Sequence, residues 1–202
     1  MIKCIFFDLG GVVLPTPIEG VLTEIARELN IPVAFLNQVR NENKEALWDG
    51  KMSVKDIVVL VKKEFSLPSS VEDILGIWEK TYLRVNLPDP KVILLIKNLK
   101  KKYKVGFISN LWDLSAQINR KRKLCADFDL CVFSCELGIH KPQKEIFDLA
   151  IKKAGCLGEE CVFIDDRKEY FKVAEEAGMK TFEYKGLDQL VLELKELGVE
   201  VK

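Results

Sequence analysis

Residues 2–14 read IKCIFFDLGGVVL, and this stretch decides the expected fold. Its nearly continuous apolar run is typical of a parallel strand buried on both faces, because a half-solvated strand would alternate polar and apolar positions. The strand ends on Asp8, and Gly10 and Gly11 follow, where glycine allows close backbone approach or positive φ. Ligands of open α/β sheets bind at the carboxyl ends of the strands. Asp8 therefore either takes part in chemistry or caps the next loop.

Residues 15–87 have the pattern of several helices with no strand between them. Apolar residues recur at helical spacing in a first helix, and a weaker second segment runs over 35–48. Ser53 with Asp56 resembles a capping box that opens a third helix, and Ser70 starts a fourth. The apolar faces of these last two helices are expected at Ile57, Leu60, Val61, Phe65, Ile74, Ile77, Trp78 and Leu83.

Helices and strands alternate after Asp89-Pro90, which is a helix N-cap followed by proline at the first helical position. This alternation predicts a Rossmann-like α/β fold, a three-layer sandwich with a mainly parallel sheet and helices on both faces. The helical block then reads as an insertion after the first strand. Strands are expected at 105–108, 130–133, 161–164 and 180–184, and helices at 90–99, 114–123, 142–154, 168–177 and 187–197.

Composition excludes several classes of function. The 202 residues are enough for one sizeable core with an insertion, and 31 basic residues balance 31 acidic ones, so no overall charge favours nucleic acid or a membrane surface. No apolar segment is long enough for a membrane span and no signal peptide is recognisable, so we expect a soluble, cytoplasmic protein.

The six cysteines lack the paired spacing of a zinc site. If Cys131 and Cys135 share a strand, they lie about 13 Å apart, beyond the reach of a disulfide. We therefore expect free, buried thiols. His140 is the only histidine, so neither a Ser-His-Asp triad nor a multi-histidine metal site is expected.

Polar residues also follow three other expected strands. Ser109 and Asn110 end one strand, Lys141 lies in the loop before the next helix, and Asp165 with Asp166 ends another strand. Each has a structural alternative, since Ser109 or one aspartate could cap a helix and Lys141 could be solvated. Together they supply a nucleophile, hydrogen-bond donors, a cation and a pair of acids suited to a metal ion.

With these four segments in order, FFDLGGVVL, FISN, HKPQKEIF and FIDD, the sequence resembles the haloacid dehalogenase-like hydrolase superfamily. The resemblance covers essentially the whole chain, because the helical block looks like the small helical cap of the subgroup with phosphoglycolate and sugar phosphatases. It implies a core domain formed by 1–14 and 88–202 and a cap domain formed by 15–87.

The resemblance also implies roles for the residues at the strand ends. Asp8 would attack phosphorus and form an aspartyl-phosphate, Ser109 would hydrogen-bond a phosphoryl oxygen, and Lys141 would neutralise their charge. Asn110 and Gly11 would complete the binding of the phosphate ester. Mg²⁺ would be the cofactor, and its expected ligands are Asp8, the Gly10 carbonyl, Asp165 and Asp166.

One position departs from the family pattern. Phosphatases of this superfamily carry a general acid two residues after the nucleophile, and here that position is Gly10. General acid-base assistance is typically worth about 10²–10⁴ in rate, so we expect a slow enzyme or a leaving group that needs little protonation. Anomeric sugar phosphates and acyl phosphates meet this condition. Glu19 of the cap or a water molecule could replace the missing acid.

Two further functions stay open on the sequence alone. A 2-haloacid dehalogenase also lacks that acid, but it needs no metal, which argues against it given Asp165 and Asp166. A protein of this fold that binds a phosphorylated ligand without turnover is the other alternative, supported by Gly10 and by Tyr170, where relatives often have Asn or Asp. Trp112 is expected at the mouth of the crevice. Neither the substrate nor an oligomeric state follows from these residues.

Overall fold

The protein is described by a computed structural model covering residues 1–201, and its centre is a five-stranded parallel sheet with the strand order β3-β2-β1-β4-β5. The first strand lies in the middle and pairs with β2 on one side and β4 on the other. The strands are β1 (Cys4–Phe7), β2 (Lys104–Ser109), β3 (Leu130–Phe133), β4 (Cys161–Asp165) and β5 (Lys180–Glu183).

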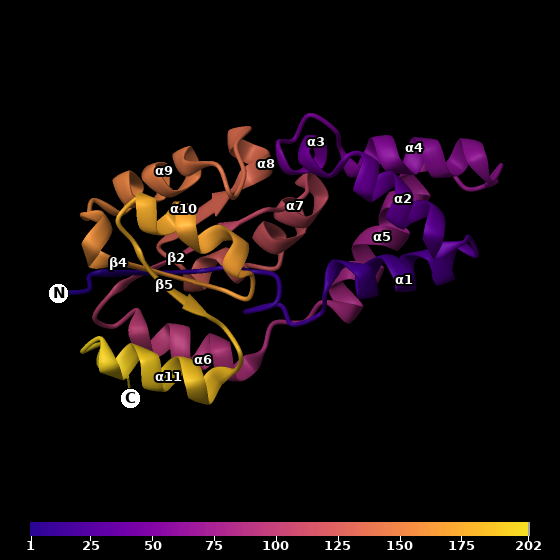
Figure 1. Ribbon diagram of the computed structural model, residues 1–202. Helices are drawn as coiled ribbons and strands as arrows, with labels where there is room; N and C mark the ends of the chain where they lie inside the picture. Colours follow the sequence, from indigo (N-terminus) through magenta and orange to yellow (C-terminus); the bar gives the residue numbers. More distant parts are fainter. Residues whose placement is uncertain (202) are drawn as a thin grey trace.

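Helices cover both faces of this sheet, which confirms the predicted α/β sandwich (Figure 1). On one face lie α6 (Pro90–Leu99) and α11 (Leu187–Glu196), and on the other lie α9 (Lys144–Ala154) and α10 (Phe171–Glu176). The β1 side chains alternate between two hydrophobic clusters: Ile5 and Phe7 belong to the α6 and α11 side, and Cys4 and Phe6 to the α9 and α10 side. Burial on both faces is why this strand is apolar at every position.

The parallel register brings the predicted polar residues to one edge of the sheet. Phe7 pairs with Phe107 and with Ile164, so the carboxyl ends of β1, β2 and β4 lie side by side. Asp8, Ser109 and Asp165 stand at this edge. Their meeting follows from strand direction alone, because parallel strands end on the same side.

The helical block lies beyond this edge (Figure 1). It has a hydrophobic cluster separate from the two clusters of the sheet, but Trp112 and Ile118 join that cluster from the core side. Ile118 lies on α7 (Asp113–Lys121), which therefore packs against the block. We keep 15–87 as the proposed cap domain. Its helices are α1 (Ile18–Leu29), α2 (Val33–Glu42), α3 (Lys44–Trp48), α4 (Val54–Glu64) and α5 (Val71–Val85).

Helix ends agree with the capping residues expected from the sequence. Ser53 and Asp56 form a complete capping box at α4, and Ser70 forms another with Asp73 at α5. Asp89 Oδ1 accepts a hydrogen bond from the Lys91 N–H at 2.8 Å, as predicted for α6. These side chains satisfy backbone donors that have no partner inside the helix.

Several local predictions were wrong. The weak segment 35–48 forms two helices that are broken at Asn43. Leu60 and Leu83, which were expected on buried helix faces, are 42% and 36% exposed, because neighbouring turns of their helices supply the buried residues. The chain turns into a short helix, α8 (Ser134–Leu137), directly after β3. Cys131 and Cys135 therefore do not share a strand. All six cysteines are free thiols as expected, but only Cys4 and Cys161 are fully buried and the other four are partly exposed.

Two helix starts also differ from prediction. The expected helix 142–154 begins at Lys144, and 168–177 is a 3₁₀ turn (Lys168–Tyr170) that leads into α10. Another 3₁₀ turn, Leu124–Asp127, precedes β3, and a third, Gly158–Glu160, precedes β4. Within residues 1–201, no helix is both long and apolar enough to span a membrane.

Candidate active site

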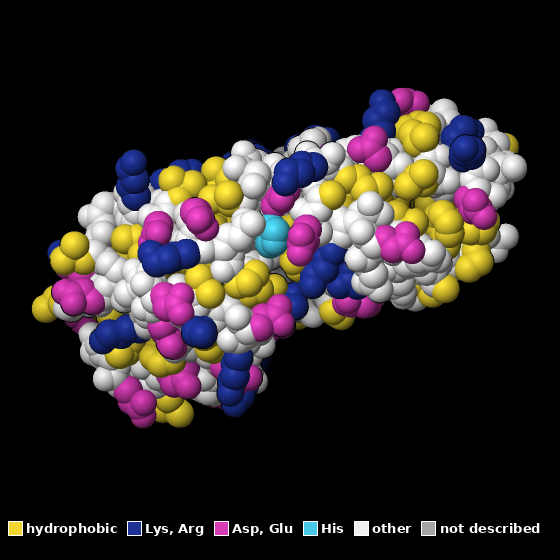
Figure 2. All heavy atoms as spheres, turned by 45° about the horizontal axis from the view of Figure 1, so that its top comes forward, with side chains coloured by type: hydrophobic (Ala, Val, Ile, Leu, Met, Phe, Trp, Pro, Cys, Tyr) yellow, Lys and Arg dark blue, Asp and Glu magenta, His cyan; other side chains and the backbone are white. Residues whose placement is uncertain are grey.

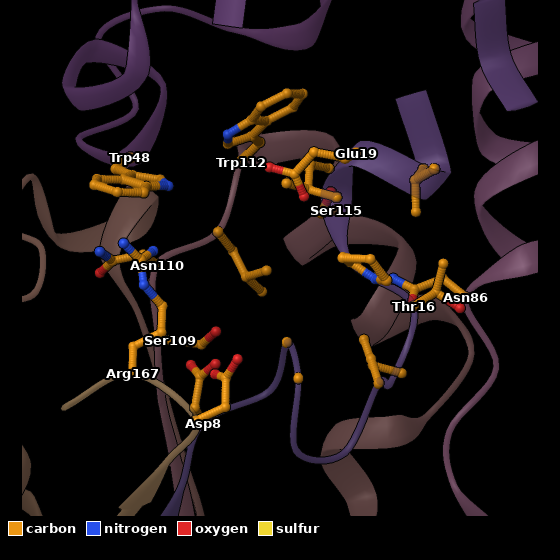
Figure 3. Close-up of a pocket in the computed structure, with 18 of the residues that line it drawn as sticks. Asp8, Thr16, Glu19, Trp48, Asn86, Ser109, Asn110, Trp112, Ser115 and Arg167 are labelled. Carbon is orange, nitrogen blue, oxygen red and sulfur yellow. The ribbon is translucent and has the colours of Figure 1, made fainter. Parts of the chain in front are cut away.

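A cavity of about 390 Å³ lies at the carboxyl edge of the sheet, between the sheet and the helical block (Figure 3). All but one of the sequence-predicted site residues line it, and the exception, Asp165, lies directly behind its wall. The core side of the wall is formed by Asp8, Gly10, Gly11, Ser109, Asn110, Lys141 and Asp166.

Lys141 holds two carboxylates together at the floor of the cavity. Its Nζ donates to Asp8 Oδ1 at 2.8 Å and to Asp165 Oδ2 at 2.5 Å, and the residue is only 1% exposed. Burial disfavours the ammonium, but Asp165 and Asp8 outweigh it and raise the pKa of Lys141. The interpretation of Lys141 as a solvated lysine was therefore wrong.

Aromatic rings complete the surroundings of this ammonium group. The Lys141 Nζ lies 4.7 Å from the centre of the Tyr170 ring and 5.1 Å from that of Phe163. Ring faces attract cations, so both rings stabilise the charge within the buried floor. Tyr170, whose identity is unusual for the family pattern, thus contacts the lysine with its ring.

The Asn110 side chain holds the lysine loop in place. Its Oδ1 accepts from the Lys141 N–H at 2.8 Å, and its Nδ2 donates to the Lys141 carbonyl at 2.9 Å. Both polar groups of the amide are therefore engaged with the backbone. The Asn110 amide therefore fixes the Lys141 backbone, and the predicted part of Asn110 in binding the substrate stays a prediction.

Ser109 keeps its hydroxyl available. The residue is 2% exposed and lines the cavity, and its hydroxyl makes no hydrogen bond within residues 1–201. The next helix, α7, starts four residues later with Trp112 at its N-cap position and has no side-chain cap. Ser109 is not a helix cap, and Figure 3 shows its oxygen directed toward Asp8.

The two glycines after β1 differ in what they require. Gly11 has φ +79°, and a Cβ built there would lie 2.5 Å from Asp166 Cγ, so a side chain is excluded by strain and by contact. A Cβ built on Gly10 would meet only Asp8 Oδ2, at 3.8 Å, and its φ is not positive. The turn therefore needs glycine at Gly11 but not at Gly10.

Three carboxylates converge on the site, with oxygens of Asp8, Asp165 and Asp166 within 4.8 Å of one another. Burial raises the pKa of Asp165 to about 7, although Lys141 acts in the opposite direction. Burial, followed by the charge of Asp8, also raises the pKa of Asp166. Clustered acids of this kind fit a hard divalent cation, which prefers oxygen ligands and relieves their repulsion.

Asp165, the last residue of β4, and Asp166 after it differ in whether their carboxylate oxygens are already hydrogen-bonded. Asp165 Oδ2 accepts from Lys141, and its Oδ1 accepts from the Arg167 N–H at 2.9 Å. The 3₁₀ turn that follows has Arg167 at its N-cap position and no side-chain cap, so neither aspartate caps it. Asp166 is exposed and lines the cavity. Asp166 and the second oxygen of Asp8 are thus better placed than Asp165 to contact an ion directly.

The helical block supplies the opposite wall of the cavity, and most of these residues were missed by sequence reasoning. Glu19, proposed as a substitute acid, lines the cavity and pairs with Arg40 Nη1 at 2.7 Å. Trp112 lines it as expected and packs on Trp78, with ring centres 6.4 Å apart. No motif marks the other residues of the block, because only tertiary packing brings them to Asp8: Thr16, Lys44, Trp48, Tyr82 and Asn86. Ser115 of α7 and Arg167, which follows Asp166, line the cavity from the core side and were also missed.

The loop after α3 closes onto the lysine loop. Asp49 Oδ1 lies 2.6 Å from His140 Nδ1, and both side chains are buried. A Cβ on Gly50 would lie 2.3 Å from the Cys135 carbonyl oxygen, so this glycine lets the two backbones touch. The Val54 N–H also donates to Asp113 Oδ1 at 2.9 Å, which joins α4 to α7. In Figure 2 the histidine is visible between acidic side chains where the two halves meet.

Comparison with known proteins shows the family of this chain. The haloacid dehalogenase-like hydrolase family matches residues 2–178, and the chain belongs to this family of hydrolases. D-ribitol-5-phosphate phosphatase of Bacteroides thetaiotaomicron is 27% identical over 197 residues, covering 91% of this chain and 92% of that protein.

Solved structures show the same fold. A HAD family enzyme of Bacteroides thetaiotaomicron, solved as a magnesium complex, is 25% identical with a TM-score of 0.74, covering 95% of this chain and 98% of that one. A 2-haloacid dehalogenase of Pseudomonas syringae has a TM-score of 0.65 at 19% identity, covering 93% and 90%. Because a dehalogenase shares the fold, the fold alone does not select the reaction.

Proposed function

We propose that this hydrolase is a Mg²⁺-dependent phosphatase that acts on a small phosphorylated metabolite, with a sugar or polyol phosphate as the favoured class. The observation that carries the proposal is the buried Lys141 bridging Asp8 and Asp165, with Asp166 beside them. Such a cluster of three acids and one cation suits an anionic group with a bound divalent ion. The 27% identical ribitol-phosphate phosphatase supports the substrate class.

In this proposal Asp8 is the nucleophile. Its carboxylate attacks phosphorus, the alcohol leaves, and water then cleaves the aspartyl-phosphate to release phosphate and restore Asp8. Lys141 neutralises the charge shared by Asp8 and the phosphoryl group, and the Ser109 hydroxyl donates to a phosphoryl oxygen. Most of the catalytic effect is positioning and charge neutralisation, which this pre-formed floor provides.

Mg²⁺ would be held by Asp8, Asp166 and the Gly10 carbonyl, with Asp165 acting through Lys141 and the Arg167 N–H. When bound, the ion supplies positive charge that polarises the phosphoryl group. Protonation of the leaving group is expected to limit the rate, because Gly10 has no side chain and the Glu19 carboxylate is paired with Arg40. Substrates with good leaving groups are therefore expected to react fastest.

A panel of phosphate esters tests this function. With Mg²⁺ we expect phosphate release, fastest from anomeric and acyl phosphates, and loss of activity with EDTA that added Mg²⁺ restores. Release of halide from a 2-haloacid in the presence of EDTA would instead establish a dehalogenase. Tight binding of a phosphate analogue without hydrolysis of any ester would establish a binding protein.

The Asn110 clamp gives a separate prediction. Asn110→Ala removes both hydrogen bonds to the Lys141 backbone, each worth about 0.5–1.5 kcal/mol. We expect kcat to fall about tenfold to a hundredfold with a smaller change in KM, because the lysine is displaced from the reacting groups. Steady-state kinetics measure this change. Asn98→Ala, at an amide outside the cavity that bonds Lys101, is the control. Equal kinetics for the two variants would contradict the positioning role.

A further inference from the structure

Three neutral polar side chains meet where the helical block joins the core. Tyr82 lies on α5, Asn86 directly follows α5, and Ser115 lies on α7. All three line the cavity and are almost fully buried. In the view of Figure 3, Asn86 and Ser115 lie across the cavity from Trp48 and Asn110. We call Tyr82, Asn86 and Ser115 the polar seam.

Asn86 has an acceptor without a partner. Its N–H donates to the Tyr82 carbonyl at 2.9 Å, and its carbonyl accepts from Arg122 Nη1 at 2.7 Å, so the backbone is fixed. The side-chain Oδ1 is buried and has no hydrogen-bond partner within residues 1–201. Buried amide oxygens are normally hydrogen-bonded, and of the buried, unpartnered amide oxygens within residues 1–201 only that of Asn86 belongs to a residue lining the cavity, where a bound donor can supply the missing partner.

The hydroxyls of the polar seam are neutral. Burial raises the pKa of Tyr82, although a hydrogen bond from Asn119 Nδ2 at 3.1 Å acts in the opposite direction. Arg40, a cation of the cavity wall, is paired with Glu19, and Arg122, whose guanidinium lies 5.8 Å from the centre of the Tyr82 ring, lies outside the cavity wall. A carboxylate placed at the seam would face the Asn86 oxygen, which repels it, whereas a hydroxyl can donate to Asn86 and accept from Ser115 or Tyr82.

We propose that the polar seam binds hydroxyl groups of the leaving alcohol, with Asn86 Oδ1 accepting from one of them. The inference rests on the phosphatase function proposed above and assigns the residues that recognise the alcohol. Among esters of ordinary alcohols, whose leaving groups are not activated, the preferred substrates are then phosphate monoesters of neutral polyols or open-chain sugars. The cavity of about 390 Å³ is of the size that small-molecule sites have.

The first test compares matched substrates. Polyol phosphates of about three to six carbons are each paired with the alkyl phosphate of the same length. Both members of a pair release a primary alcohol, and the Asn86→Ala variant described below separates binding at the seam from the inductive effect of the hydroxyls on the leaving group. We expect kcat/KM to be at least about tenfold higher for the polyol, because the alkyl ester leaves Asn86 Oδ1 unsatisfied.

A phosphorylated hydroxy acid of the same length is the third substrate. This substrate tests the alternative that Lys44 binds a second anionic group of the substrate. The Lys44 ammonium lies 4.5 Å from the centre of the Trp48 ring. The highest kcat/KM for this acid would overturn the proposal. Equal values for polyol and alkyl esters would also overturn it, and would mean that Asn86 Oδ1 binds only a buried water.

Two variants locate the effect. In Asn86→Ala the ratio of polyol to alkyl kcat/KM is expected to fall toward one. Asn37 is a matched control, since its Oδ1 is also buried without a partner but lies outside the cavity. Asn37→Ala should keep the wild-type ratio, and an unchanged ratio in Asn86→Ala would contradict the assignment. The substrate comparison on wild type stands even if a variant fails to fold.

Hydrolysis of p-nitrophenyl phosphate distinguishes a failure of the phosphatase proposal from a failure of the polar-seam proposal. Its leaving group carries no hydroxyl chain and needs little protonation. No hydrolysis of it or of any ester with Mg²⁺ would refute the phosphatase function. Hydrolysis of it without a polyol advantage would refute only the role of the polar seam.

Discussion

Asp8→Asn is expected to lower kcat by about 10⁴-fold or more, because an amide oxygen is a poor nucleophile and cannot form the aspartyl-phosphate. The substitution keeps the size of the side chain and leaves Lys141 its second partner, Asp165. Phosphate release from p-nitrophenyl phosphate with Mg²⁺ measures the loss. Acid quenching of the wild type during turnover of a ³²P-labelled phosphate ester, followed by peptide analysis, should locate the phosphoryl group on Asp8.

Asp148→Asn is the control for this prediction. Asp148 is an exposed acid on α9 that pairs with Lys144 at 2.7 Å, and it lies outside the cavity. Its variant should retain wild-type kinetics. If Asp8→Asn kept more than about a tenth of the activity, a nucleophilic role for Asp8 would be untenable.

Gly10→Asp is expected to raise kcat/KM for simple alkyl phosphates by about 10²–10⁴ by supplying the missing general acid. The local structure accepts a side chain here, because the nearest atom to an added Cβ is Asp8 Oδ2 at 3.8 Å and φ is not positive. The gain should be smaller for anomeric or acyl phosphates, whose leaving groups need less protonation. Rates across both kinds of ester measure the difference.

Gly10→Asn separates proton transfer from size. Asparagine has the same shape as aspartate but no carboxyl proton to donate, so it should leave the alkyl phosphates slow. Equal rates for the Asp and Asn variants would show that leaving-group protonation does not limit this enzyme.

The fold and the floor of the site could be predicted because both depend on local patterns. The apolar run before Asp8 requires a strand covered on both faces, and parallel strands bring Ser109 and Asp165 to the same edge. The capping residues Ser53 and Asp89 fixed two helix starts in the same way.

The opposite wall could not be predicted, since its residues have no common spacing with the floor. Asn86 lies 78 positions after Asp8 in the sequence and reaches the cavity only through the packing of α5 on α7. Asn110 was assigned to substrate because nothing in the sequence shows that its amide bonds the Lys141 backbone. Such contacts depend on the relative orientation of elements that are distant in the sequence. The periodicity of the residues does not encode this orientation.

The buried pair of Asp49 and His140 joins the helical block to the loop that carries Lys141. His140 immediately precedes Lys141, so the loop after α3 holds the residue next to the buried ammonium. Any separation of the two halves must hydrate Asp49 and His140 and pull on the peptide that carries the lysine. A movement of the helical block relative to the core would therefore be transmitted directly to the peptide that carries the central positive charge.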